Sequence, residues 1–210
     1  MNPFTRLIVF IKRKDDDKFL DLYKYARCTY HYLLWCIRYP RLLAHRCFIG
    51  RGADLTIGRK ATLQFGRDVY FMNNFNGEFY GNVTLGNGVH FQPNCRVTVQ
   101  SGLTMGEYAG CAEGVSIHDS THPLTGSDDN YNARPMVTKP IVIGRNVWIG
   151  AKATILHGVT IGDNTVIGAH ALVTKDIPAN ALVVGIPARV VRVIEPQEAE
   201  SEPAASLARH

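Results

Sequence analysis

The sequence has few cysteines, and their spacing matches no common framework. Only five of the 210 residues are cysteine, an odd number, and no two form a CxxC pair, which argues against a disulfide scaffold and a zinc ribbon. The N-terminus also lacks a charged region before its short apolar run and a cleavage site after it, so we expect no signal peptide. We expect reduced packing residues of a cytosolic protein at Cys28, Cys36, Cys47, Cys95 and Cys111.

Long apolar runs and clustered charges are also missing. The most apolar stretch, residues 30–39, contains His31 and Arg38 and is far shorter than the about 20 residues that cross a bilayer. The net charge is +5, but the basic residues are scattered, so we expect no nucleic-acid binding. With 46% hydrophobic and 20% charged residues, the composition is typical of one globular domain with a small attachment.

The attachment is predicted to be helical. Apolar residues between Lys18 and Tyr39 recur at intervals of three and four, as on an amphipathic helix that Pro40 would end or kink. We assign residues 1–47 to an N-terminal helical segment that caps one end of the following domain. Its basic and aromatic residues leave a second interpretation open, namely peripheral association with the cytosolic face of a membrane.

Aliphatic residues at every sixth position define the rest of the chain. A second position of each hexad holds Val, Ala or Thr, and glycine follows the aliphatic residue in four hexads, at Gly144, Gly150, Gly162 and Gly168. This spacing does not fit a helix. It predicts short strands that stack coil over coil in an all-β parallel solenoid, with glycine allowing the backbone to turn. The first phase holds without a miss at Ile143, Ile149, Ile155, Ile161, Ile167 and Val173.

The same spacing continues upstream and sets the bounds of the solenoid. Upstream, the six-residue spacing continues in a second phase, which shifts by two residues near residue 105. A first coil is expected at Ile57, Leu63 and Val69. Residues 70–82, which follow it, depart from the pattern. We therefore predict a β-helix domain over residues 48–194. The polar tail, residues 195–210, is predicted to be disordered. The second phase runs through Leu85, Phe91, Val97 and Leu103, then through Met105, Cys111 and Ile117.

One long interruption, residues 118–140, is predicted to leave the coil as an excursion loop. It is rich in Asp, Asn, Ser, Thr and Pro, and long loops on rigid scaffolds tend to carry function. Neutral imidazole suits a general base near neutral pH, so the histidines of this loop, among them His122 directly before Pro123, are candidates for such a base. The titratable residues of the loop are His118, Asp119, His122, Asp128, Asp129 and Arg134.

Residues 141–194, from IVIGRNVWIG to the GIPARVVRVI ending, together with the THP motif, resemble the hexapeptide-repeat acyltransferases. That family includes galactoside and maltose O-acetyltransferases and the acetyltransferases of capsule, colanic acid and O-antigen synthesis. The similarity covers about residues 82–194. It implies a left-handed β-helix, a homotrimer with active sites between neighbouring subunits, and a cytoplasmic, acetyl-CoA-dependent O-acetyltransferase of polysaccharide biosynthesis that needs no metal.

The resemblance also implies roles for individual residues. His122 matches the general base that takes a proton from the acceptor hydroxyl, and Ala151 matches the backbone amide beside the oxyanion. Trp148 matches the aromatic residue along the pantetheine arm. The remaining positions that match contacts with coenzyme A are Ala169, Thr174, Lys175, Arg189 and Arg192.

The acceptor side departs from the family pattern. Where the galactoside and maltose enzymes have an Asn and an Asp, this chain has Gln92 and Gln100, so we expect a saccharide acceptor other than galactoside or maltose. The NFN sequence at residues 74–76 resembles the acceptor motif but lies one coil too early.

Three alternatives remain open. The chain could be an N-acetyltransferase of an amino sugar or nucleotide sugar. It could instead be a zinc enzyme like the gamma-type carbonic anhydrases, although the spacing of His118 and His122 does not match that family. Third, it could be an inactive scaffold that holds the N-terminal segment at a membrane. In the zinc enzyme, the possible metal ligands are His118, His122 and His157.

Overall fold

The computed structural model describes residues 47–123 and 134–193. The predictions for residues 1–46, for the middle of the excursion and for the tail after residue 194 therefore lie outside the described residues. The chain divides into two units, Met1–Leu43 and Ala44–His210, and all described residues belong to the second. No helix in the described ranges is long and apolar enough to cross a membrane.

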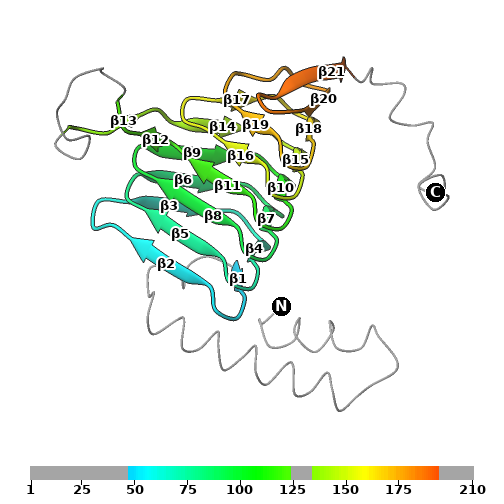
Figure 1. Ribbon diagram of the computed structural model, residues 1–210. Coiled ribbons are helices and arrows are strands. Elements are labelled where there is room, and N and C mark those ends of the chain that lie inside the picture. The colour runs from blue at the N-terminus through cyan, green and yellow to red at the C-terminus, as the bar shows by residue number, and fades with distance from the viewer. Residues whose placement is uncertain (1–46, 124–133, 194–210) are drawn as a thin grey trace, which may run out of the picture. The chain divides into compact units, whose positions relative to one another are not determined.

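Three sheets form the sides of a coil that the chain follows repeatedly (Figure 1). We call them sheets A, B and C, in the order in which the chain visits them. Sheet A contains β1 (Cys47–Ile49), β4 (Val69–Phe71), β7 (His90–Phe91), β10 (Gly110–Cys111), β15 (Trp148–Ile149), β18 (Val166–Ile167), β20 (Ala181–Val184) and β21 (Arg189–Val193). Sheet B contains β2 (Asp54–Ile57), β5 (Asn76–Phe79), β8 (Arg96–Val99), β11 (Ser116–His118), β16 (Thr154–Ile155) and β19 (Leu172–Val173). Sheet C contains β3 (Thr62–Phe65), β6 (Asn82–Leu85), β9 (Gly102–Met105), β14 (Ile141–Ile143) and β17 (Thr160–Ile161).

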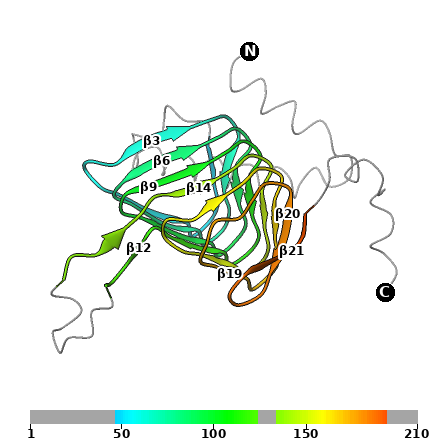
Figure 2. The same ribbon diagram turned by 90° about the horizontal axis from the view of Figure 1, so that it is seen from above.

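Neighbouring strands within these sheets are parallel, except for β20 and β21, which pair as an antiparallel hairpin at the end of sheet A. Each coil thus adds one strand to every sheet, at a spacing of about 4.8 Å. The view from above shows the sheets as the sides of the coil, joined at three corners (Figure 2). This is the β-solenoid that the six-residue period predicts.

The inward side chains confirm the predicted period. The six aliphatic residues of the first phase, from Ile143 to Val173, are at most 1% exposed. Residues 70–82, which break the sequence pattern, nevertheless form a regular coil with aromatic side chains inside. Phe71 and Phe91 stack with ring centroids 5.5 Å apart, and Phe75 lies 4.7 Å from Phe71. The departure therefore marks larger core residues and not a break in the coil.

The four hexad glycines have a different role from the one expected. None of them has a positive φ. At Gly150, however, an added Cβ would lie 2.6 Å from the Ala169 backbone nitrogen and 2.8 Å from the Gly168 carbonyl carbon. These glycines are required because the next coil comes too close for a side chain. Most non-glycine residues that turn the corners with positive φ are asparagines: Asn74, Asn94, Asn146, Asn164 and Asn180.

Candidate active site

The excursion leaves the coil at the corner between sheets B and C. After β11 the chain forms β12 (Ser120–Thr121), which pairs antiparallel with β13 (Val137–Thr138) on the returning segment. The Lys139 N–H donates to the Asp119 carbonyl oxygen at 2.9 Å, which closes the root of the loop. His122 directly follows β12 and is exposed. The structure therefore presents the candidate base on a short hairpin with an anchored root.

Asp119 is a buried residue of the excursion whose contacts the sequence did not predict. Its side chain is fully buried, and its carboxylate accepts hydrogen bonds from the backbone N–H groups of Gln100 (2.7 Å), Ser101 (2.6 Å) and Gly102 (2.9 Å). The Ser101 hydroxyl donates a fourth bond at 3.0 Å. Strand alternation contained the signal: Ile117 points inward, His118 outward, and Asp119 inward again.

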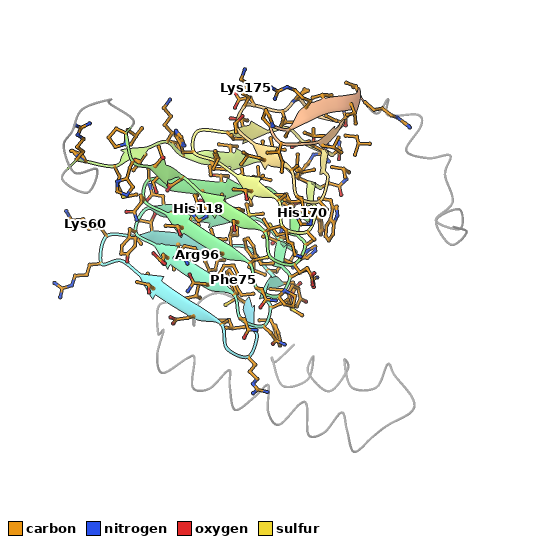
Figure 3. All side chains as sticks on the ribbon, viewed as in Figure 1. Lys60, Phe75, Arg96, His118, His170 and Lys175 are labelled. Carbon is orange, nitrogen blue, oxygen red and sulfur yellow. The ribbon has the colours of Figure 1, made fainter. Side chains whose placement is uncertain are left out.

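His118 lies on the outer face of sheet B (Figure 3). Burial lowers the pKa of its imidazole, and the nearby Arg96 charge lowers it further, while Glu78 and Asp119 act in the opposite direction. Arg96 Nη2 lies 2.9 Å from Glu78 Oε1. The outer face of sheet B beside the excursion is thus polar and carries both charges.

Trp148 points outward from sheet A and is 42% exposed, as a wall for a ligand requires. Its ring lies 5.9 Å from that of His90, although Gly110 stands between the two in the ladder. A side chain at Gly110 would collide with the His90 ring. His90 is a neighbour of the predicted wall that the sequence analysis did not identify, because the contact depends on the glycine between two distant hexads.

The other predicted residues occupy two corners and the final hairpin. Ala151 and Ala169 lie one above the other at the A/B corner, where the His170 N–H donates to the Ala151 carbonyl oxygen at 2.8 Å. Gln92 lies at the same corner, two coils earlier. The residues at the B/C corner are Gln100, Thr174 and Lys175, and those on β21 are Arg189 and Arg192.

The NFN sequence was predicted to lie one coil before the acceptor position at Gln92, and the structure does not place it there. Asn74 stacks on Asn94, with Asn74 Nδ2 donating to Asn94 Oδ1 at 3.2 Å. Met72 and Gln92 are the equivalent pair instead, because each follows the paired residues Phe71 and Phe91. The coil is two residues longer at this point than in the later hexads, so Asn74 and Gln92 occupy different places at the corner, and Asn76 begins β5 in sheet B.

One chain does not bring the predicted base and the predicted coenzyme wall together. β12 and β13 project from the B/C corner, which is opposite the side formed by sheet A. Both views show the hairpin on the far side of the coil from β20, with β15 and β18 in the same sheet as β20 (Figures 1 and 2). His122 and Trp148 could share one site only if a second copy of the chain contributed.

Metal ligation was the alternative role of the histidines. Within residues 47–123 and 134–193 of one chain, no group of three or more His, Cys, Asp or Glu residues could hold a metal ion.

Stacked hexads with a histidine-bearing excursion define the class of hexapeptide-repeat transferases. Residues 140–175 match the family described as bacterial transferase hexapeptide (six repeats). The chain is 35% identical over 143 residues to galactoside O-acetyltransferase of Escherichia coli (strain K12), covering 68% of this chain and 66% of that enzyme. It thus spans just under two thirds of that relative. The chain belongs to the hexapeptide-repeat acetyltransferase family, with galactoside and maltose O-acetyltransferases as homologues.

Two solved structures have a similar fold. One is a maltose O-acetyltransferase from Clostridium difficile 630, with 25% identity and a TM-score of 0.50, covering 91% of this chain and 84% of that one. The other is a hexapeptide-repeat acetyltransferase from Vibrio cholerae O1 biovar eltor complexed with acetyl coenzyme A, with 23% identity and a TM-score of 0.50, covering 91% and 85%. At that identity the second shows the fold alone.

Proposed function

We propose that this protein is an acetyl-CoA-dependent O-acetyltransferase that modifies a sugar hydroxyl during synthesis of a cell-surface polysaccharide. The observation that carries the proposal is His122, an exposed histidine on an anchored excursion of a hexapeptide-repeat fold. Homologues named as galactoside and maltose O-acetyltransferases support the reaction type, and a fold relative complexed with acetyl coenzyme A supports the donor.

In the proposed reaction, His122 removes the proton from the acceptor hydroxyl as the oxygen attacks the thioester carbonyl carbon. The tetrahedral oxyanion accepts a hydrogen bond from the Ala151 backbone N–H, a donor held in place by the coil. Collapse of this intermediate breaks the carbon–sulfur bond. The imidazolium of His122 returns the proton to the leaving thiolate, which gives coenzyme A and the acetyl ester.

The coenzyme would lie along the later coils. Trp148 packs against the pantetheine arm, while the exposed basic side chains of Lys175, Arg189 and Arg192 attract the nucleotide phosphates. Backbone groups near Ala169 and Thr174 complete the contact. These positions occur on coils that the excursion does not interrupt.

The proposed assembly is a homotrimer of left-handed β-helices in which each site combines two subunits. Support comes from the geometry of one chain, where the excursion and sheet A lie on opposite sides of the coil (Figure 2). His122 of one subunit would act on acetyl-CoA bound along its neighbour.

A mixing experiment tests this arrangement. His122→Ala removes the base, and Ala169→Trp blocks the coenzyme surface, so each variant alone should be inactive. Co-expressed in equal amounts, they should recover about a quarter of the wild-type activity, because random assembly gives an intact base facing an intact coenzyme surface at about a quarter of all interfaces. If the mixture stays inactive while both variants form mixed trimers, the shared site is wrong.

The acceptor is proposed to be a saccharide other than galactoside or maltose. Gln92 and Gln100 provide amide donors and acceptors for sugar hydroxyls, and neither carries the negative charge that those enzymes have on this side. A polysaccharide precursor at the cytoplasmic face of the membrane fits this neutral amide pair and the basic, aromatic N-terminal segment.

The direct test offers labelled acetyl-CoA together with sugars, amino sugars, sugar nucleotides and lipid-linked oligosaccharides. Transfer of label to a product that loses it in hydroxylamine would identify an ester and support O-transfer. A product stable to hydroxylamine would identify an amide and establish the N-acetyltransferase instead. Stoichiometric zinc in the purified protein without acetyl transfer to any acceptor would replace the proposal with the zinc enzyme.

A further inference from the structure

Asp119 joins the excursion to the corner that carries Gln100. Its carboxylate holds the backbone of residues 100–102, and its main chain begins the hairpin that presents His122. We propose that Asp119 is a positioning residue for acetyl transfer, which fixes His122 relative to the acceptor side at Gln100. This inference rests on the proposed function.

A comparison with the preceding coil explains why a carboxylate is needed here. One coil earlier, the N–H groups of Tyr80 and Gly81 donate to the Val99 carbonyl oxygen, and that of Asn82 donates to the Ser101 carbonyl oxygen. At this B/C corner the preceding coil therefore satisfies its amides with backbone carbonyl groups of the next coil. At residues 100–102 the next coil is interrupted, because the chain departs after residue 119 and returns near residue 139.

The side chain of Asp119 replaces the missing carbonyl groups. Oδ1 accepts one bond from Gln100, and Oδ2 accepts two from the backbone and hydroxyl of Ser101 and one from Gly102. Three successive amide groups converge on one buried carboxylate, and hydrogen bonds from N–H groups to a carboxylate are short and strong. A neutral side chain with one acceptor oxygen could not satisfy all of these donors.

The main chain of Asp119 is fixed on both sides. Its N–H donates to the Thr98 carbonyl oxygen at 3.3 Å, and its carbonyl oxygen accepts from the Lys139 N–H at 2.9 Å. Lys139 in turn accepts a bond from the Gly158 N–H at 3.0 Å. Asp119 thereby connects the preceding coil with the returning segment, and Lys139 connects that segment with the following coil.

The position of His122 depends on this connection. Within the described residues, two ladder pairs join the strands of the hairpin beyond Asp119, namely Ser120 with Thr138 and Thr121 with Val137. A shift at Asp119 would therefore change the position of His122, which directly follows β12, relative to the backbone of Gln100. Small displacements of a reacting group can reduce turnover strongly.

The test replaces Asp119 with Asn, which keeps the shape but turns one oxygen into a donor facing the corner amides. We expect kcat to fall about 10²-fold, while the KM for acetyl-CoA stays unchanged because residues 148–192 lie on other coils. Hydrogen exchange of the Gln100, Ser101 and Gly102 amides should become faster. Ser101→Ala, which removes only the hydroxyl bond, should lower kcat less and leave the KM for acetyl-CoA unchanged.

The matched control is Asp163→Asn. Asp163 also accepts a backbone bond, from Arg145 at 2.9 Å, but at the corner between sheets C and A, away from the excursion. The Asp163→Asn variant should keep the wild-type kcat and the wild-type amide hydrogen exchange at residues 100–102.

The outcomes separate this inference from the proposed function. A folded Asp119→Asn protein with faster exchange at residues 100–102 but wild-type kcat would overturn the positioning role. An equal loss of kcat and of acetyl-CoA binding would also overturn it, since that marks a general structural defect. If Asp119→Asn does not fold, Ser101→Ala decides, and unchanged kcat in that variant refutes the inference. A wild-type protein with these amides protected but without any transferase activity would instead refute the proposed function.

Discussion

Replacing Gly150 with alanine tests how closely the coils pack at the corner between sheets A and B. The new Cβ would lie 2.6 Å from the Ala169 nitrogen and 2.8 Å from both the Gly168 carbonyl carbon and the Ile167 carbonyl oxygen, whereas ordinary contact begins at 3.4 Å. All three are backbone atoms, so no side chain can rotate away. The coils must separate by about 0.8 Å, out of a spacing of about 4.8 Å.

That separation also stretches the hydrogen bond from the Gly150 N–H to the Ile167 carbonyl oxygen, now 2.7 Å long. Overpacking usually costs about 1–3 kcal/mol, and we expect the upper end because only backbone can yield. For a chain of this length, about 3 kcal/mol corresponds to a fall in Tm of about 6–12 °C.

Thermal unfolding followed by circular dichroism measures the effect, with Gly102→Ala as the matched control. A Cβ at Gly102 would meet the Pro140 Cβ at 3.3 Å and the Asn82 carbonyl oxygen at 3.7 Å, so its Tm should change little. If Gly150→Ala melts at the wild-type temperature, the close-approach explanation of the hexad glycines is wrong.

Two further predictions concern pH. Because burial lowers the pKa of His118 below 6.5, the unfolded chain binds more protons than the folded chain as the pH falls below 6.5, and the free energy of unfolding should fall there. Urea titrations should show that this free energy falls less in His118→Gln than in the wild type. Burial raises the pKa of Cys95 to about 11 and that of Cys111 well above 9.0. Thiols ionise first in the unfolded chain, so stability should fall above pH 9.0, and mass mapping should find both thiols unlabelled until unfolding. Labelling of either thiol in the native protein would contradict this burial.

The stacking of the hexads could be predicted because it depends on a local repeat. An aliphatic residue at each sixth position needs no knowledge of its partners, and residues such as Ile155 and Ile167 are accordingly buried. The excursion could be predicted for the converse reason, since its polar composition interrupts the repeat between Ile117 and Ile141.

Features that join different coils could not be predicted in the same way. The corner-to-corner step is 20 residues from Arg67 to Asn87 but 18 from Arg145 to Asp163, so a fixed period misaligns the early coils. Because of this variation, the residue one coil before Gln92 is Met72 and not Asn74, two residues later.

The contacts of Asp119 and Trp148 have the same origin. Asp119 replaces carbonyl groups of an interrupted coil, and Trp148 approaches His90 across the bare backbone of Gly110. Neither relation appears in the neighbouring sequence, because both depend on residues one or two coils away.

The catalytic role of His122 is the central claim, and the turnover of His122→Ala tests it most directly. Thiol release from acetyl-CoA should be measured with the acceptor identified in the panel, alongside the affinity for coenzyme A. Loss of a general base lowers kcat by about 10²- to 10⁴-fold, and coenzyme affinity should stay at the wild-type value because the proposed coenzyme surface is on other coils. Acetyl transfer by His122→Ala at the wild-type rate would contradict the account.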